Sequence, residues 1–145
     1  MNDLARELGA SETVAKNASG LTAAGSHSSA RDLVLFLRAA TANATISRIL
    51  AKRKARIATV AGRHRHVVWR STDYVNKYEG SLGKSGWTTP AKNTLVVVTE
   101  IDGRRIAVAS LGVPSGYSTS GARALTQWAA ENFTGLKAVG RLPLA

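Results

Sequence analysis

The chain has 145 residues, 44% of them hydrophobic, which is the size and composition of one globular domain. It has no cysteine, so disulfides, thiolate catalysis and cysteine-ligated metal sites are excluded. Twenty lysines and arginines against nine acidic residues give a formal net charge of +11, which favours polyanionic partners.

The basic excess is concentrated in one stretch. No acidic residue lies between Asp32 and Asp73. The same stretch holds nine basic residues: Arg38, Arg48, Lys52, Arg53, Lys54, Arg56, Arg63, Arg65 and Arg70. Such a field attracts nucleic acid, anionic lipid headgroups or anionic wall polymers, and composition does not choose among them.

In the first half of the chain the pattern predicts helices. Residues 2–8 are expected to form a short helix, and residues 10–27 to be irregular. A longer helix is predicted to start at Ser28 or Ser29, because Ser29 and Asp32 have the spacing of a capping box. A further helix is expected over residues 44–53.

The second half alternates strands with turns. Residues 56–61 and 66–69 predict a hairpin with a basic tip, residues 71–83 are turn-rich, and residues 94–99 and 105–111 predict two strands joined by an Asp-Gly turn. A last helix is predicted from Ser120, as N-cap, to Phe133, with Leu125, Trp128 and Ala129 on one face. This order of elements predicts an α+β fold with an antiparallel sheet.

The segment Leu82 to Thr88 (Leu-Gly-Lys-Ser-Gly-Trp-Thr) carries the clearest chemistry. Lys84 places a fixed positive charge, and the Ser85 hydroxyl can bind a carboxylate. Gly86 lets a ligand backbone approach because it has no Cβ, and the Trp87 N–H is a candidate oxyanion donor. If only the tripeptide Lys-Ser-Gly is considered, an exposed turn before a strand explains it as well as a ligand-binding motif does.

Further blocks lie around this segment in order: Met1, Asn2, Leu8, Gly9, Gly20 and Leu21; Ser28 to Leu33; Asn76, Gly80, Gly83 and Thr88; Asp102 to Arg105, Leu111 and Gly112. Together with Lys-Ser-Gly, they resemble the serine-type D-alanyl-D-alanine carboxypeptidases, the low-molecular-mass penicillin-binding proteins. The resemblance covers nearly the whole chain.

The resemblance implies the carboxypeptidase-transpeptidase and serine β-lactamase type of fold, an antiparallel sheet flanked by helices, incomplete at the N-terminus. It implies removal of the terminal D-Ala from peptidoglycan stem peptides, β-lactams as ligands of the full-length family, and export. Lys84 would act in catalysis, and Ser85, Gly86, Trp87 and Thr88 in substrate binding. No metal and no organic cofactor are implied.

The chain departs from the family in its catalytic motifs. The family's Ser-x-x-Lys nucleophile motif and its Ser-x-Asn motif precede the Met-Asn block, with which this chain begins. The only Ser-x-x-Lys here, Ser81 to Lys84, follows a turn, whereas the nucleophile should open a buried helix. Ser71-Thr72-Asp73 is a poor substitute for Ser-x-Asn. We therefore expect no catalysis by the chain alone.

Three hypotheses remain open: part of the enzyme, inactive alone; a pseudoenzyme that binds wall peptides; and a basic nucleic-acid-binding domain. The first treats residues 1–133 as a partial carboxypeptidase domain and residues 134–145 as a tail. No apolar run approaches the roughly 18 residues of a membrane span, and no signal peptide is expected in the chain as given. His27, His64 and His66 do not form a metal set, and His64 and His66 are better explained by a solvated basic hairpin.

Overall fold

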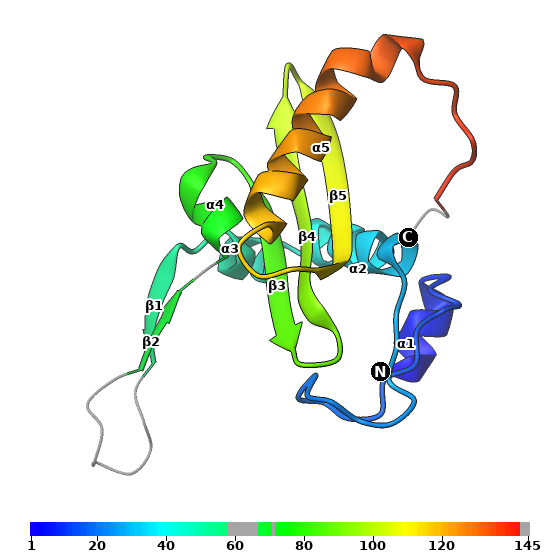
Figure 1. Cartoon of the computed structure of the whole chain (residues 1–145), viewed down its shortest axis with the longest axis vertical. Coiled ribbons are helices and arrows are strands. Elements are labelled where there is room, and N and C mark those ends of the chain that lie inside the picture. The colour runs from blue at the N-terminus through cyan, green and yellow to red at the C-terminus, as the bar shows by residue number, and fades with distance from the viewer. Residues whose placement is uncertain (58–66, 71, 143–145) are drawn as a thin grey trace.

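The central feature of the computed structural model is a three-stranded antiparallel sheet with helices on both faces (Figure 1). The structure describes residues 1–57, 67–70 and 72–142. The sheet has the order β3-β4-β5, with β3 at Leu82–Thr88, β4 at Lys92–Ile101 and β5 at Arg104–Val113. A second sheet pairs β1 (Lys54–Ile57) with β2 (Val67–Arg70). The predicted antiparallel α+β fold is confirmed.

Five α-helices and a 3₁₀ turn complete the described part of the chain. They are α1 (Asn2–Glu7), α2 (Ala30–Ala42), α3 (Ala44–Leu50), α4 (Asp73–Lys77), α5 (Ser118–Asn132) and the turn Phe133–Gly135. Helix α5 crosses one face of the sheet and α2 lies behind the other (Figure 1). No single described helix is long and apolar enough to cross a membrane. Helices α2 and α3 meet that test together, by length and composition alone, with a 109° bend between them.

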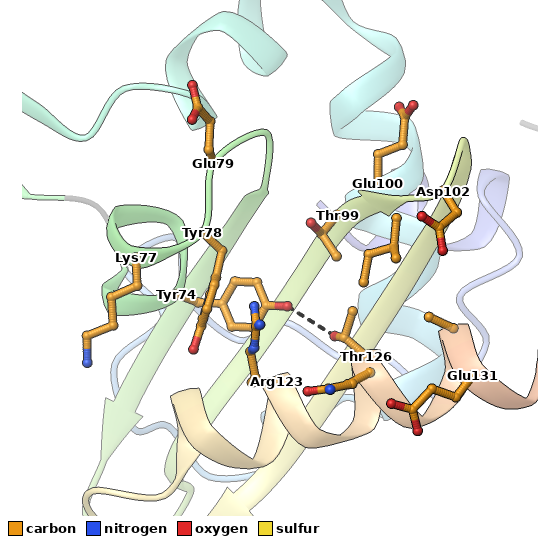
Figure 2. A pocket seen from close by; sticks show the side chains of 13 residues that line it. Tyr74, Lys77, Tyr78, Glu79, Thr99, Glu100, Asp102, Arg123, Thr126 and Glu131 are labelled. Carbon is orange, nitrogen blue, oxygen red and sulfur yellow. Dashed lines mark hydrogen bonds between the residues drawn. The ribbon is translucent and has the colours of Figure 1, made fainter.

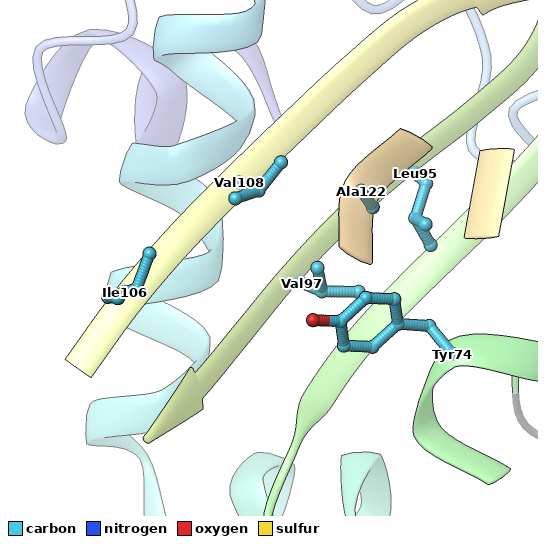
Figure 3. Close-up of a cluster of buried hydrophobic side chains, with 6 residues drawn as sticks. All are labelled: Tyr74, Leu95, Val97, Ile106, Val108 and Ala122. Carbon is cyan, nitrogen blue, oxygen red and sulfur yellow. The ribbon is translucent and has the colours of Figure 1, made fainter. Parts of the chain in front are cut away.

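Strand β4 is buried on both sides because its side chains alternate between two apolar clusters. Leu95 and Val97 point to the α5 side, where Tyr74, Ile106, Val108 and Ala122 close around them (Figure 3). Val96 and Val98 point to the other side and pack with Leu37 of α2. The run of β-branched residues in β4 thus fills both cores of the sheet.

A buried carboxylate joins the N-terminal segment to α2. The Ser29 hydroxyl accepts from the Asp32 N–H at 3.2 Å, so the Ser29 half of the predicted capping box is confirmed, whereas the Asp32 carboxylate is bonded elsewhere. The Asp32 carboxylate, fully buried, accepts from the Glu12 N–H and the Thr13 hydroxyl, each at 2.8 Å. The Arg31 guanidinium donates to the same carboxylate at 3.3 Å. Asp32 therefore fixes the otherwise irregular segment before α2, because a buried charge must be paired.

Three details differ from the sequence predictions. Residues 73–77 form α4, because the Thr72 hydroxyl caps this short helix by accepting from the Val75 N–H. Helix α5 starts at Ser118, so Ser120 is inside the helix and is not its N-cap. Leu125 and Trp128 are 48% and 53% exposed, because α5 turns its smaller residues toward the sheet. The predicted hairpin tip, residues 62–65, lies outside the described residues, as do His64 and His66.

We expect Asp32→Ala to lower the free energy of unfolding by about 3 kcal/mol, because three donors lose a buried charged acceptor. Urea unfolding followed by circular dichroism measures the change. Asp3→Ala is the matched control, since its ion pair with Arg6 is exposed and contributes little. Equal stabilities for the two variants would contradict the role given to Asp32.

Candidate functional site

Lys-Ser-Gly lies in the middle of β3, which is an edge strand: among the described strands, only β4 pairs with it. Lys84 is opposite Val96, Ser85 opposite Leu95 and Gly86 opposite Thr94. The motif is thus part of a regular strand and not an exposed turn before one. Its other edge is open to a ligand within the described part of the fold.

The two polar side chains of the motif lie on opposite faces of the sheet. Lys84 shares a face with Val96, on the α2 side, and Ser85 shares a face with Leu95, on the α5 side. A ligand that contacts both side chains must therefore lie along the open edge of β3 and not on either face. A peptide bound in this way would pair with β3 as an additional strand of the sheet.

The backbone also presents hydrogen-bonding groups to that edge. The Thr94 hydroxyl donates to the Gly86 carbonyl oxygen at 3.2 Å, so this carbonyl faces β4. Backbone groups of successive residues point to opposite edges of a strand, so the N–H and C=O of Ser85 and Trp87 face the open edge. The Lys84 ammonium donates to the Ser85 carbonyl oxygen, which places its charge at the same edge.

Two further predicted site residues follow on the same strand. The Trp87 side chain is 64% exposed, so it is available to a ligand and does not belong to the core. Thr88 ends β3 opposite Lys92, and its hydroxyl accepts from the Ala91 N–H at 3.3 Å, which stabilises the turn into β4. The structure thus brings Lys84, Ser85, Gly86 and Trp87 to one edge and leaves Thr88 at its end.

Ser81 has a structural position. It is 4% exposed, precedes β3 and donates its hydroxyl to the Tyr78 carbonyl oxygen. It does not open a helix, and so Lys84 is not one helical turn beyond it. Ser81 therefore lacks the geometry of the family's nucleophile. In Ser71-Thr72-Asp73, the poor substitute for Ser-x-Asn, Thr72 caps α4 and Ser71 lies outside the described residues.

Glycines allow β3 to approach β4 closely. A Cβ on Gly83 would lie 2.6 Å from Cγ1 of Val97 and would also collide with the Val96 carbonyl oxygen. A Cβ on Gly86 would meet only the Thr94 hydroxyl oxygen, at 3.0 Å. Gly83 therefore sets the packing of the strand, whereas a side chain at Gly86 would meet only the side chain of Thr94.

A cavity of about 500 Å³ lies apart from this edge, between α4, α5 and the β4–β5 turn (Figure 2). The Tyr74 hydroxyl donates to the buried Thr126 hydroxyl at 3.1 Å, and the Arg123 guanidinium lies 4.2 Å from the centre of the Tyr78 ring. No local sequence pattern points to these residues, because Tyr74 and Thr126 are 52 residues apart. None of the predicted site residues lines the cavity, and its mixture of charges indicates no particular ligand.

Residues 1–115 match the family model described as D-alanyl-D-alanine carboxypeptidase. The chain belongs to this family. It is 34% identical over 114 residues to a D-alanyl-D-alanine carboxypeptidase of Mycobacterium tuberculosis H37Rv, a match that covers 77% of this chain and 38% of that protein. The resemblance found in the sequence is therefore confirmed at the level of the family.

Solved structures agree on the fold. A D-alanyl-D-alanine carboxypeptidase from M. tuberculosis H37Rv is 30% identical with a TM-score of 0.73, over 95% of this chain and 53% of that one. The DD-transpeptidase of Streptomyces K15 is 22% identical with a TM-score of 0.74, over 87% of this chain and 50% of that one, and it supports the fold alone. The chain thus spans about half the length of these solved relatives.

We expect Gly83→Ala to destabilise the protein by about 2 kcal/mol, because its methyl group would force β3 away from β4. Gly86→Ala should cost less than about 1 kcal/mol, because only the Thr94 side chain must move. Thermal unfolding of the two variants measures the difference. A larger loss at Gly86 than at Gly83 would show that the register of β3 on β4 is wrong.

Proposed function

We propose that the chain supplies the substrate-binding strand of a serine-type D-Ala-D-Ala carboxypeptidase that acts on peptidoglycan stem peptides. The observation that carries the proposal is the open edge of β3, where the Lys84 ammonium donates to the Ser85 carbonyl oxygen and the backbone groups of Ser85 and Trp87 face away from β4. A peptide ending in a carboxylate is complementary to such an edge, because backbone hydrogen bonds fix its direction and the cation binds its terminus.

Each residue has a distinct part in this proposal. Lys84 stabilises negative charge on the substrate and takes part in proton transfer at the reacting centre. The Ser85 hydroxyl binds the terminal carboxylate, while Gly86 leaves the substrate backbone room to approach. The Trp87 N–H stabilises the oxyanion, and Thr88 closes the end of the strand. β-Lactams, which the family binds, would occupy the same edge.

Hydrolysis needs a nucleophile that these residues do not provide. The only Ser-x-x-Lys in the chain is Ser81 to Lys84, and the Ser81 hydroxyl is buried against the Tyr78 carbonyl. We therefore propose that the 145 residues bind the peptide terminus but form no acyl-enzyme alone. Turnover would require a segment that contributes a helical serine and its lysine base. The proposed place of action is the cell wall or periplasm, where the family works.

A fusion tests this proposal and the role of each side chain. The N-terminal segment of the mycobacterial relative, with its Ser-x-x-Lys, is joined ahead of Met1, and acylation by a fluorescent penicillin is followed. The fusion should be labelled and the 145-residue chain should not. In the fusion, Lys84→Ala should slow acylation about a hundredfold, equivalent to about 3 kcal/mol, because a cation is lost from the site.

The serine variants are the matched controls. Ser85→Thr should have little effect because it keeps the hydroxyl, and Ser85→Val should be slower because it keeps the bulk but removes the carboxylate's partner. Labelling of the 145-residue chain would refute the absence of a nucleophile. Normal acylation of the Lys84→Ala fusion would show that Lys84 lies outside the site.

A further inference from the structure

A second surface combines exposed positive charge with exposed aliphatic side chains. It covers α3 and the start of β1 and is here called the α3–β1 surface, made of Ile46, Arg48, Ile49, Lys52, Arg53 and Lys54. The β1–β2 hairpin continues from it away from the main sheet (Figure 1). The predicted role of Lys-Ser-Gly makes no use of these residues.

The packing of α3 determines what this surface presents. Leu50 packs against the cluster of Leu37, Val96 and Val98, so this side of the helix faces the body of the protein. Ile46 and Ile49, one helical turn apart, are 43% and 50% exposed. Aliphatic side chains exposed as neighbours favour contact with an apolar phase.

Positive charge surrounds the two isoleucines. Arg48, Lys52 and Lys54 are exposed, and no hydrogen bond or ion pair is seen for their side chains within the described residues. The Arg53 guanidinium donates to the Asn76 carbonyl oxygen at 3.3 Å, which ties the start of β1 to α4. Arg48, Lys52 and Lys54 are therefore exposed to solvent beside α3.

The charge of the whole chain is concentrated between Asp32 and Asp73, the stretch that contains the α3–β1 surface. Of its nine basic residues, four lie on this surface, and the stretch has no acidic residue, whereas the other eleven basic residues of the chain are offset by all nine acidic ones. The remainder of the protein is thus close to neutral, and the +11 net charge is largely that of one region. A charge distribution of this kind orients the protein toward an anionic surface.

We propose that the α3–β1 surface docks on the anionic headgroups of a lipid bilayer. The cations would contact phosphate groups, and Ile46 and Ile49 would enter the boundary between headgroups and acyl chains. The isoleucines favour a bilayer over a nucleic acid, because single strands are bound by aromatic stacking and this surface has no aromatic residue. The proposal is independent of the proposed function, since it uses none of the β3 residues.

Co-sedimentation with vesicles tests the proposal on the full 145-residue chain. Binding should occur to phosphatidylcholine vesicles with about a third phosphatidylglycerol and be at least about tenfold weaker to pure phosphatidylcholine. It should fall steeply as salt rises from about 0.05 to 0.5 M, because salt screens the charges. Equal binding to both vesicles, or no effect of salt, would overturn the proposal without any variant.

Matched charge reversals locate the contact. Arg48→Glu/Lys52→Glu/Lys54→Glu should weaken binding to the anionic vesicles by more than about tenfold, since each cation contributes separately. Lys16→Glu/Lys137→Glu/Arg141→Glu makes the same change in net charge at exposed positions elsewhere and should weaken binding much less. Equal losses for the two triples would show that only net charge matters and would refute the α3–β1 surface.

The isoleucines distinguish a bilayer from a polyanion. Ile46→Ser/Ile49→Ser should weaken vesicle binding several-fold and leave binding to double-stranded DNA unchanged, because only the bilayer offers an apolar phase. Full vesicle binding by this variant would refute insertion. If the chain bound DNA more tightly than vesicles at about 0.15 M salt, the ligand of this surface would be nucleic acid and not a bilayer.

Discussion

The position of β4 between β3 and β5, buried on both faces, is the constraint on which the rest of the structure depends. Its five consecutive buried residues, 95–99, alternate between the two faces of the sheet, so that one strand contributes to both apolar clusters. Because α2 and α5 pack against opposite faces of this strand, its register decides where β3 lies. The absence of a Cβ at Gly83 lets β3 come close to it. The geometry of Lys-Ser-Gly is therefore a consequence of the core.

An edge strand held in this way presents a row of backbone groups, and edge strands invite pairing with another chain. Here Lys84, exposed Trp87 and two glycines occupy that edge, and a charged residue also discourages indiscriminate pairing. We infer that the same features which protect the edge also select a short peptide with a carboxylate end. The α3–β1 surface has a different chemistry, cationic and aliphatic, and it shares no residue with this edge.

Much of this fold follows from local patterns in the sequence. The Ser29 cap, the β-branched run of β4 and the Asp102-Gly103 turn each carry their signal within a few residues. The orientation of α5 does not follow from a local pattern. Leu125 and Trp128 have the spacing of a buried apolar face, but the smaller Ala122 and Thr126 are the residues of α5 that are buried. Helix α4 depends on the Thr72 cap within a turn-rich segment. For the site, the sequence identified the motif through the family resemblance, but the separation of Lys84 and Ser85 onto opposite faces needed the register with β4.

The central claim is that a D-Ala-D-Ala terminus lies along the open edge of β3. The most direct measurement is a titration of the ¹⁵N-labelled chain with an acyl-D-Ala-D-Ala peptide, followed by the backbone amide resonances. The account predicts the largest shifts at the Ser85 and Trp87 amides, which face the open edge, and smaller shifts at Gly86, which faces β4. Shifts concentrated instead around Tyr74, Arg123 and Thr126 would place the ligand in the cavity under α5 and contradict the account.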